Sequence, residues 1–152
     1  MRYEVSTTIN RPLADVFQFV SNVENQSRWQ AATVRNTQLT PGPLRVGTQM
    51  RHTGKWLGRN YESTAEVIEY EPNRKWGYRS VAGPYDLVMH YYFEPIENGT
   101  RLTMDVQGDA KGFFGFFKFV EPLVGRAAEK TLNDDLARLK TVLESEITPI
   151  TN

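Results

Sequence analysis

The chain has 152 residues, with 18 basic and 18 acidic side chains and no cysteine. This length fits a single domain, the balanced charge argues against an electrostatic nucleic-acid binder, and the lack of cysteine excludes disulfides and thiolate chemistry. Two histidines leave little for a metal centre, so we expect neither a metal nor a cofactor. No apolar stretch is long enough for a signal peptide or a membrane span. We therefore expect a cytoplasmic protein without a transmembrane segment.

The first forty residues predict a strand, two short helices and a second, weaker strand; the second helix could equally be a polar turn. Apolar and polar side chains alternate at the start, as they do in a strand with one buried face. Asn10 suits the cap of the following helix, and Pro12 suits its first turn. In chain order, these elements cover residues 3–9, 13–20, 21–28 and 31–39.

The middle of the chain predicts a meander of five strands separated by turn residues. Asn98-Gly99 is typical of a tight hairpin turn in which both central residues take a positive φ. On the last two strands apolar residues alternate with polar ones, which is typical of an antiparallel sheet with one buried face. The strands cover residues 46–53, 61–70, 75–81, 85–93 and 101–107.

The last third predicts one long amphipathic helix over residues 122–144. Four leucines, at 132, 136, 139 and 143, form a single stripe at helical spacing. Pro122 is expected to kink this helix or to mark its start, and residues 148–152 read as a frayed tail. Because the stripe needs an apolar partner, we expect an α+β fold in which a curved antiparallel sheet of six to seven strands wraps around the helix. Such a sheet often leaves a cavity beneath it.

Several short patterns, in the same order along nearly the whole chain, resemble the START-like (SRPBCC) superfamily, which includes polyketide cyclase/dehydrase-like proteins. This resemblance implies a helix-grip fold in one domain over residues 1–147. It does not define an activity, because the superfamily holds ligand carriers, cyclases and lipid-transfer domains. The patterns are Ile9-Asn10-Arg11-Pro12, Val46-Gly47-Thr48, Glu69-Tyr70-Glu71-Pro72, Phe93-Glu94-Pro95 and Leu139-Lys140-Thr141-Val142-Leu143-Glu144.

The inner face of the predicted sheet is rich in aromatic residues and methionine. Plain core packing would explain this composition, and so would a ligand cavity with apolar walls and a few polar tips. The residues that we expect to bind a ligand are Met50, His52, Tyr61, Trp76, Tyr78, Met89, Tyr91, Phe93, Met104, Phe113 and Phe116.

The two histidines are expected on opposite faces. His52 alternates with Met50 and falls on the inner face, where it is the candidate catalytic acid or base, a polar contact, or a strand-end residue without chemistry. His90 falls on the outer face and is expected to be a solvated surface residue. No recognisable catalytic motif accompanies either histidine, so the catalytic residue is left open.

The segment Gly112–Phe117 holds four phenylalanines and two glycines between the last strand and the long helix. It could plug one end of the cavity, or act as a mobile gate. An exposed apolar segment also suits a lipid-touching edge or a contact in a homodimer.

Three functions therefore stay open. The first is binding of a small hydrophobic or aromatic ligand, such as a lipid, a quinone or a polyketide-like compound. The second is a cyclase or dehydratase that uses His52 or a tyrosine such as Tyr61, Tyr78 or Tyr91 as its acid or base. The third is a protein- or membrane-interaction module that works through residues 113–117. The expected partner is a small hydrophobic molecule, and nucleic acid is not expected.

Overall fold

The computed structural model describes residues 2–110 and 121–146. Its seven strands form one antiparallel sheet in the order β1-β7-β6-β5-β4-β3-β2. The elements are β1 (Arg2–Ile9), α1 (Leu13–Ser21), the 3-10 helix η1 (Val23–Arg28), β2 (Thr33–Gln38), β3 (Gln49–Trp56), β4 (Arg59–Glu71), β5 (Lys75–Ala82), β6 (Tyr85–Ile96), β7 (Gly99–Ala110) and α2 (Glu121–Ser145).

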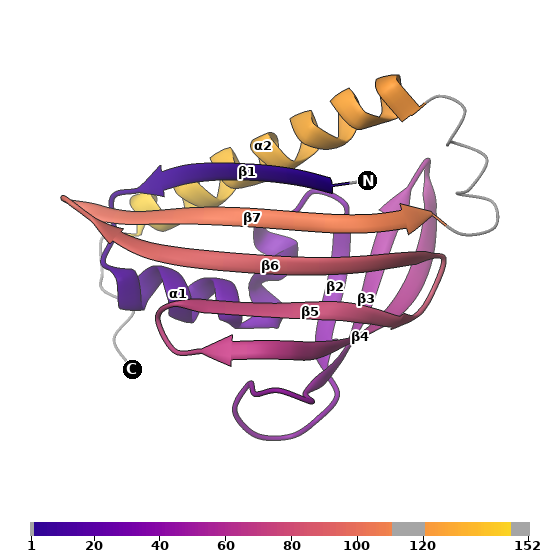
Figure 1. Cartoon of the computed structure of the whole chain (residues 1–152), viewed down its shortest axis with the longest axis horizontal. Helices are drawn as coiled ribbons and strands as arrows, with labels where there is room; N and C mark the ends of the chain where they lie inside the picture. The colour runs from indigo at the N-terminus through magenta and orange to yellow at the C-terminus, as the bar shows by residue number, and fades with distance from the viewer. Residues whose placement is uncertain (1, 111–120, 147–152) are drawn as a thin grey trace.

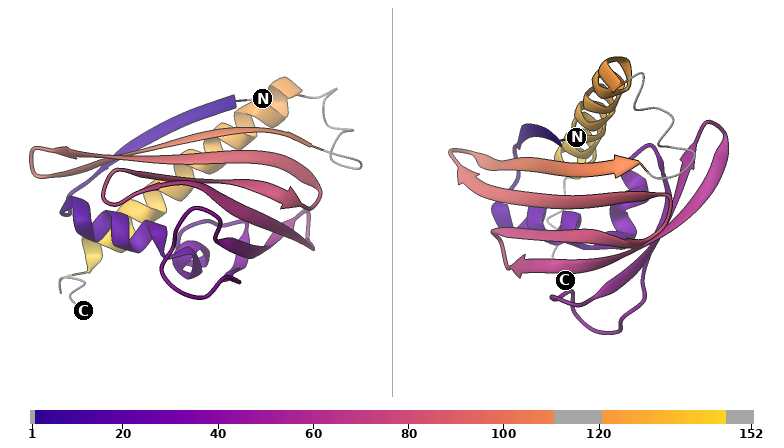
Figure 2. Two further views of the ribbon diagram at one scale, coloured as in Figure 1. Left: turned by 60° about the horizontal axis from the view of Figure 1, so that its bottom comes forward. Right: turned by 45° about the vertical axis from the view of Figure 1, so that its right-hand side comes forward.

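The sheet curls around the helices, which gather on its concave side (Figures 1 and 2). The long helix α2 runs along β1, and α1 lies beneath the middle strands. This is the helix-grip fold that the sequence predicted, with seven strands and a C-terminal helix.

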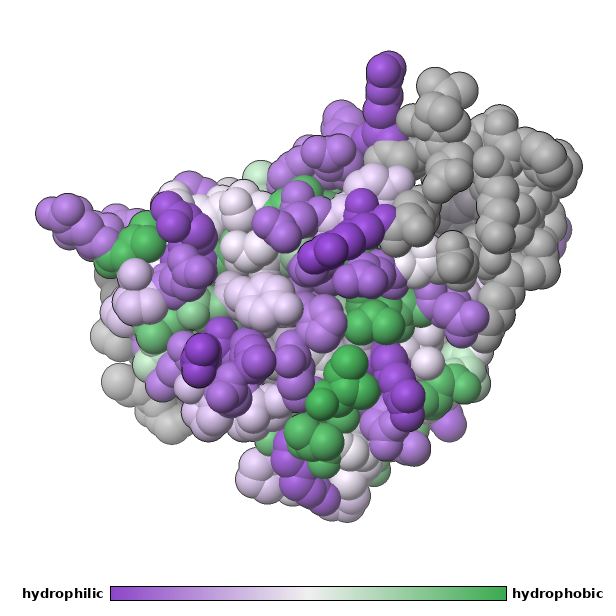
Figure 3. Space-filling model, viewed as in Figure 1, coloured by the Kyte–Doolittle hydropathy of each residue, from purple (hydrophilic) through white to green (hydrophobic). Residues whose placement is uncertain are grey.

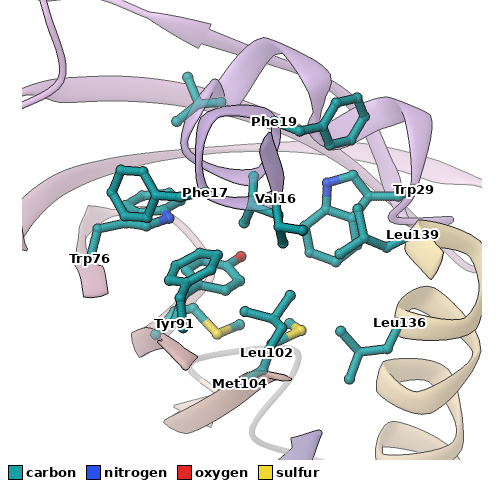
Figure 4. Packing of buried hydrophobic residues seen from close by; sticks show 14 of the residues in the cluster. Val16, Phe17, Phe19, Trp29, Trp76, Tyr91, Leu102, Met104, Leu136 and Leu139 are labelled. Carbon is teal, nitrogen blue, oxygen red and sulfur yellow. The ribbon is translucent and has the colours of Figure 1, made fainter. Parts of the chain in front are cut away.

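The core lies between the sheet and the two α-helices (Figure 4). Phe17 of α1 packs edge-on against Phe93 of β6, with ring centroids 4.9 Å apart. From α2, the buried leucines are Leu136, Leu139 and Leu143, whereas Leu132 is half-buried. The leucine stripe thus faces the core beneath the sheet, as predicted.

Of two predicted details near the helices, the cap of α1 needs correction, whereas the expectation that Pro122 marks the start of the long helix is confirmed. Asn10 does not cap α1: Pro12 occupies the cap position without a side-chain hydrogen bond, and the backbone N–H of Asn10 donates to the carboxylate of Glu144 at 3.0 Å. Pro122 produces no kink in mid-helix because α2 begins at Glu121, which leaves the proline in the first turn, where its missing N–H costs nothing.

The predicted strand over residues 46–53 is displaced. β3 begins at Gln49 and continues through Gly54 to Trp56, because Gly54 pairs with Tyr61 in the ladder instead of ending it. In the β6–β7 turn only Asn98 has a positive φ, 65°. Gly99 is required for a different reason, since a Cβ there would collide with the carbonyl oxygen of Ile9.

The convex face of the sheet is largely hydrophilic (Figure 3). His90 lies on this face as predicted, yet it is not a freely solvated residue. Its Nδ1 lies 2.5 Å from Oε1 of Glu69, and its ring stacks on Tyr92. Gly77 lies between these two side chains on the intervening strand, and a Cβ there would stand 2.9 Å from the imidazole Nδ1. The missing side chain therefore allows His90 and Glu69 to meet across β5.

Within residues 2–110 and 121–146, no helix has the length and apolar character needed to cross a bilayer. The predicted aromatic segment over residues 113–117, with Phe113 and Phe116, lies outside the described residues, as does the tail predicted over residues 148–152.

Candidate ligand cavity

A cavity of about 240 Å³ lies between the concave face of the sheet, the segment from η1 to β2, and helix α2. Its walls combine aliphatic side chains and methionines with phenols, amides, hydroxyls, one imidazole and one carboxylate. The lining residues are Gln26, Gln30, Ala32, Thr33, Asn36, Met50, His52, Tyr61, Ser63, Ala65, Tyr78, Ser80, Tyr85, Leu87, Met89, Thr131, Leu132 and Asp135.

Three tyrosines from three strands form one wall of the cavity. The rings of Tyr61 and Tyr85 meet edge to face at 5.7 Å, and the Tyr85 hydroxyl lies 3.1 Å from the Ser63 hydroxyl. Gly54 makes room for this arrangement, because a Cβ at that position would overlap the Tyr61 ring. Burial raises the pKa of Tyr61 and of Tyr78 above the ordinary value of 10.0. Both phenols are therefore neutral at pH 7, and each is hydrogen-bonded to another tyrosine, Tyr61 to Tyr85 and Tyr78 to Tyr91.

A chain of side-chain amides lines another part of the cavity. Asn36 donates to Gln26, which in turn donates to Gln30. The Oε1 of Gln30 also accepts the hydroxyl proton of Thr33 at 3.1 Å, and its Nε2 donates to the Tyr91 hydroxyl at 3.4 Å. These contacts join η1, β2 and β6, so the polar wall is held by its own hydrogen bonds without any ligand.

The protonation of His52 follows from this network. Its Nε2 lies 2.9 Å from the Thr33 hydroxyl oxygen, whose single proton is directed to Gln30. His52 must then carry its proton on Nε2, which leaves Nδ1 buried without a partner among the described residues. Burial lowers the pKa of His52 from 6.5 to about 4. At neutral pH the imidazole is uncharged and is poorly suited to act as a general acid.

Asp135 projects from α2 and fastens this helix to the segment before β2. Its Oδ1 accepts the backbone N–H of Ala31 at 3.1 Å and an N–H of Arg138 at 3.0 Å. Burial nevertheless raises the pKa of Asp135, with the two hydrogen bonds acting in the opposite direction. It is the only carboxylate among the described residues that line the cavity.

The predicted ligand-binding residues fall into three groups. Met50, His52, Tyr61, Tyr78 and Met89 line the cavity. Trp76, Tyr91, Phe93 and Met104 share the concave face but are packed into the core, where Trp76 stacks on Tyr91 at 4.8 Å. Of these four, Phe93 packs against Phe17 of α1. Phe113 and Phe116 lie outside the described residues.

Sequence reasoning missed most of the polar lining. The residues it did not predict include Gln26, Gln30, Thr33, Asn36, Ser63, Tyr85 and Asp135. For Asn36 a signal existed, because it lies on a strand that pairs with β3 directly opposite His52. For Asp135 the only signal was its place beside Leu136 in the buried stripe.

The family model for polyketide cyclase / dehydrase and lipid transport matches residues 1–144. None of the curated proteins compared with the chain matches it in sequence. Among solved structures, the protein TTHA0849 of Thermus thermophilus is 15% identical, with a TM-score of 0.82 over 97% of this chain and 100% of that one. A START superfamily protein of Mycobacterium smegmatis is 16% identical, with a TM-score of 0.76 over 94% and 97%.

The Zhui aromatase/cyclase of a Streptomyces species is also 16% identical, with a TM-score of 0.74 over 97% of this chain and 96% of that one. Likeness at this identity defines the fold alone, which is that of a START-like protein. The family match over residues 1–144 shows that the chain belongs to the polyketide cyclase/dehydrase and lipid transport family.

Proposed function

We propose that this protein binds a compact hydrophobic or aromatic molecule in the cavity between the sheet and α2. The observation that carries the proposal is the lining itself, in which methionine, aliphatic and aromatic surface is combined with polar groups that could orient a ligand, as in small-molecule sites. Because Gln26, Gln30 and Thr33 are joined by their own hydrogen bonds, this polar wall is preorganised and binding need not order it.

The cavity volume narrows the ligand class. An apolar cavity of about 150 Å³ accommodates benzene, so 240 Å³ suits a molecule of one or two rings. We therefore favour a quinone or a polyketide-like phenol over a long-chain lipid. The hydroxyls of Tyr61 and Tyr78, which burial keeps protonated, would reach its oxygen atoms by turning away from Tyr85 and Tyr91.

A second candidate function is a cyclase or dehydratase that acts on a poly-oxo substrate in the same cavity. Asp135 favours it, because a carboxyl group with a raised pKa next to neutral phenols is a suitable acid and base pair for enolisation and water loss. His52, with its lowered pKa, would then position groups rather than donate a proton. The third function predicted from the sequence, an interaction module at residues 113–117, falls outside the described residues.

Titration of intrinsic tryptophan fluorescence with 2-naphthol, 1,4-naphthoquinone and palmitate tests the binding proposal. Thr131 is exposed on α2 yet lines the cavity, so Thr131→Trp would block it at little cost in stability. Thr141→Trp, exposed on the same helix outside the lining, is the matched control. We expect micromolar binding of a ring compound, about −8 kcal/mol, that Thr131→Trp abolishes and Thr141→Trp preserves. Equal binding by both variants, or none by the wild type, would refute the site.

A further inference from the structure

The β3–β4 turn presents a leucine in an unfavourable place. Leu57 has φ 50° and is 73% exposed, the largest exposure of any large hydrophobic residue that the structure describes. The left-handed region disfavours branched side chains and favours Gly, Asn and Asp. Elsewhere among the described residues, the non-glycine positions with positive φ are both asparagine, Asn73 and Asn98. Neither backbone conformation nor burial accounts for a leucine at this turn.

The turn also stands out from the body of the protein. The pairing of β4 with β5 stops at Thr64 and Ala82, the last residue of β5. Residues 59–63 at the start of β4 therefore extend beyond the end of β5. The right-hand view of Figure 2 shows the β3–β4 hairpin rising at the edge of the molecule. Leu57 is therefore a protruding apolar tip rather than part of a flat surface.

Basic side chains surround this tip. Residues 51–62 contain three formal positive charges, on Arg51, Lys55 and Arg59, and one negative charge, on Glu62. All three basic residues are exposed. No ion pair between described residues includes any of them. A leucine that protrudes between exposed cations has the chemistry of an interfacial anchor, in which the apolar side chain enters the bilayer and the cations meet lipid phosphates.

We propose that the tip at residues 55–59 docks the protein peripherally on an anionic lipid bilayer. A bilayer fits this tip better than a protein partner does, because a stable protein interface needs about 800 Å² from each side, which a single turn does not offer. Two further exposed valines, Val34 and Val81, lie at the ends of β2 and β5 that point the same way. Docking would bring the cavity close to the membrane, because Tyr61 lines the cavity and only two residue pairs of the β3–β4 ladder separate it from the turn.

Co-sedimentation with vesicles tests this proposal, using phosphatidylcholine alone and phosphatidylcholine mixed with phosphatidylglycerol. Leu57→Asn is the decisive variant, because asparagine suits the backbone at this turn and the melting temperature should stay equal or rise. Its affinity for the anionic vesicles should fall about tenfold, which corresponds to the burial of one leucine. The control is Val46→Asn, another well-exposed apolar position before the opposite end of β3, which should leave binding unchanged.

Charge provides a second arm of the test. The double variant Lys55→Gln with Arg59→Gln should bind the anionic vesicles at least tenfold more weakly, because each cation near an anionic surface raises the affinity about fivefold. Added salt should weaken the binding of the wild type. The proposal is overturned if the wild type does not sediment with anionic vesicles at low salt, or if Leu57→Asn and Val46→Asn behave alike. It is equally overturned if Leu57 proves to mediate self-association, seen as a dimer that Leu57→Asn dissociates without any vesicle binding.

Discussion

The buried imidazole of His52 makes stability depend on pH in a predictable direction. The pKa of His52 is about 4 in the folded protein and 6.5 in the unfolded chain. Between these two values the unfolded chain binds a proton that the folded protein rejects, so folding stability falls as pH falls. At about 1.36 kcal/mol for each pH unit of separation, the loss between pH 7 and pH 4 is about 3 kcal/mol.

Urea denaturation at a series of pH values measures this effect when the wild type is compared with His52→Gln, which cannot titrate. The difference in the free energy of unfolding between the two proteins should be constant above pH 7 and should shift by about 3 kcal/mol toward the variant by pH 4. The affinity for ligand should not change through titration of His52 between pH 6 and pH 8, because His52 is already neutral in that range. Parallel stability curves down to pH 4 would refute the placement of His52 as a buried, neutral side chain.

Three further predictions follow from the packing. Leu136→Ala should lower the free energy of unfolding by about 2–5 kcal/mol, as truncation of buried leucines does. Leu132→Ala should lower it less, because Leu132 is half-buried beside the cavity. Equal losses for the two variants in urea denaturation would contradict the docking of α2. Gly77→Ala should cost about 1–3 kcal/mol and should separate the His90 and Glu69 side chains, detectable as a shift of the His90 imidazole resonances. Asp135→Asn removes a carboxyl group whose pKa is raised by burial in the folded protein. The stability of the wild type relative to this variant should therefore increase as pH falls through that pKa. A difference in stability that does not change with pH would contradict the burial of Asp135.

The fold could be predicted largely from local patterns. Alternation along the strands and the leucine stripe each bury one face, and a sheet with one apolar face and a helix with one apolar stripe have a single good way to pack. The displaced strand involves a glycine: the pattern predicts a strand that ends at residue 53, whereas Gly54 continues the ladder and admits the Tyr61 ring. A pattern reports that a glycine is present but not which neighbour needs the space.

The site was harder to predict because alternation gives the face of a residue but not what covers it. Tyr78 and Trp76 share one face of one strand, yet the first lines the cavity and the second is sealed into the core. Polar residues such as Gln26 and Asp135 read as solvent-facing in a helix. They reach the interior only because η1 and α2 approach each other over the concave sheet, which is a tertiary arrangement that no local pattern records.

Methionine methyl NMR tests the central claim most directly, because the described residues hold three buried methionines, of which two line the cavity. Met50 and Met89 line the cavity, whereas Met104 is fully buried outside it. On saturation with 2-naphthol, or with whichever ring compound of the fluorescence panel binds best, the methyl resonances of Met50 and Met89 should shift and that of Met104 should stay in place. Saturable binding that leaves Met50 and Met89 unmoved would contradict a ligand site between the sheet and α2.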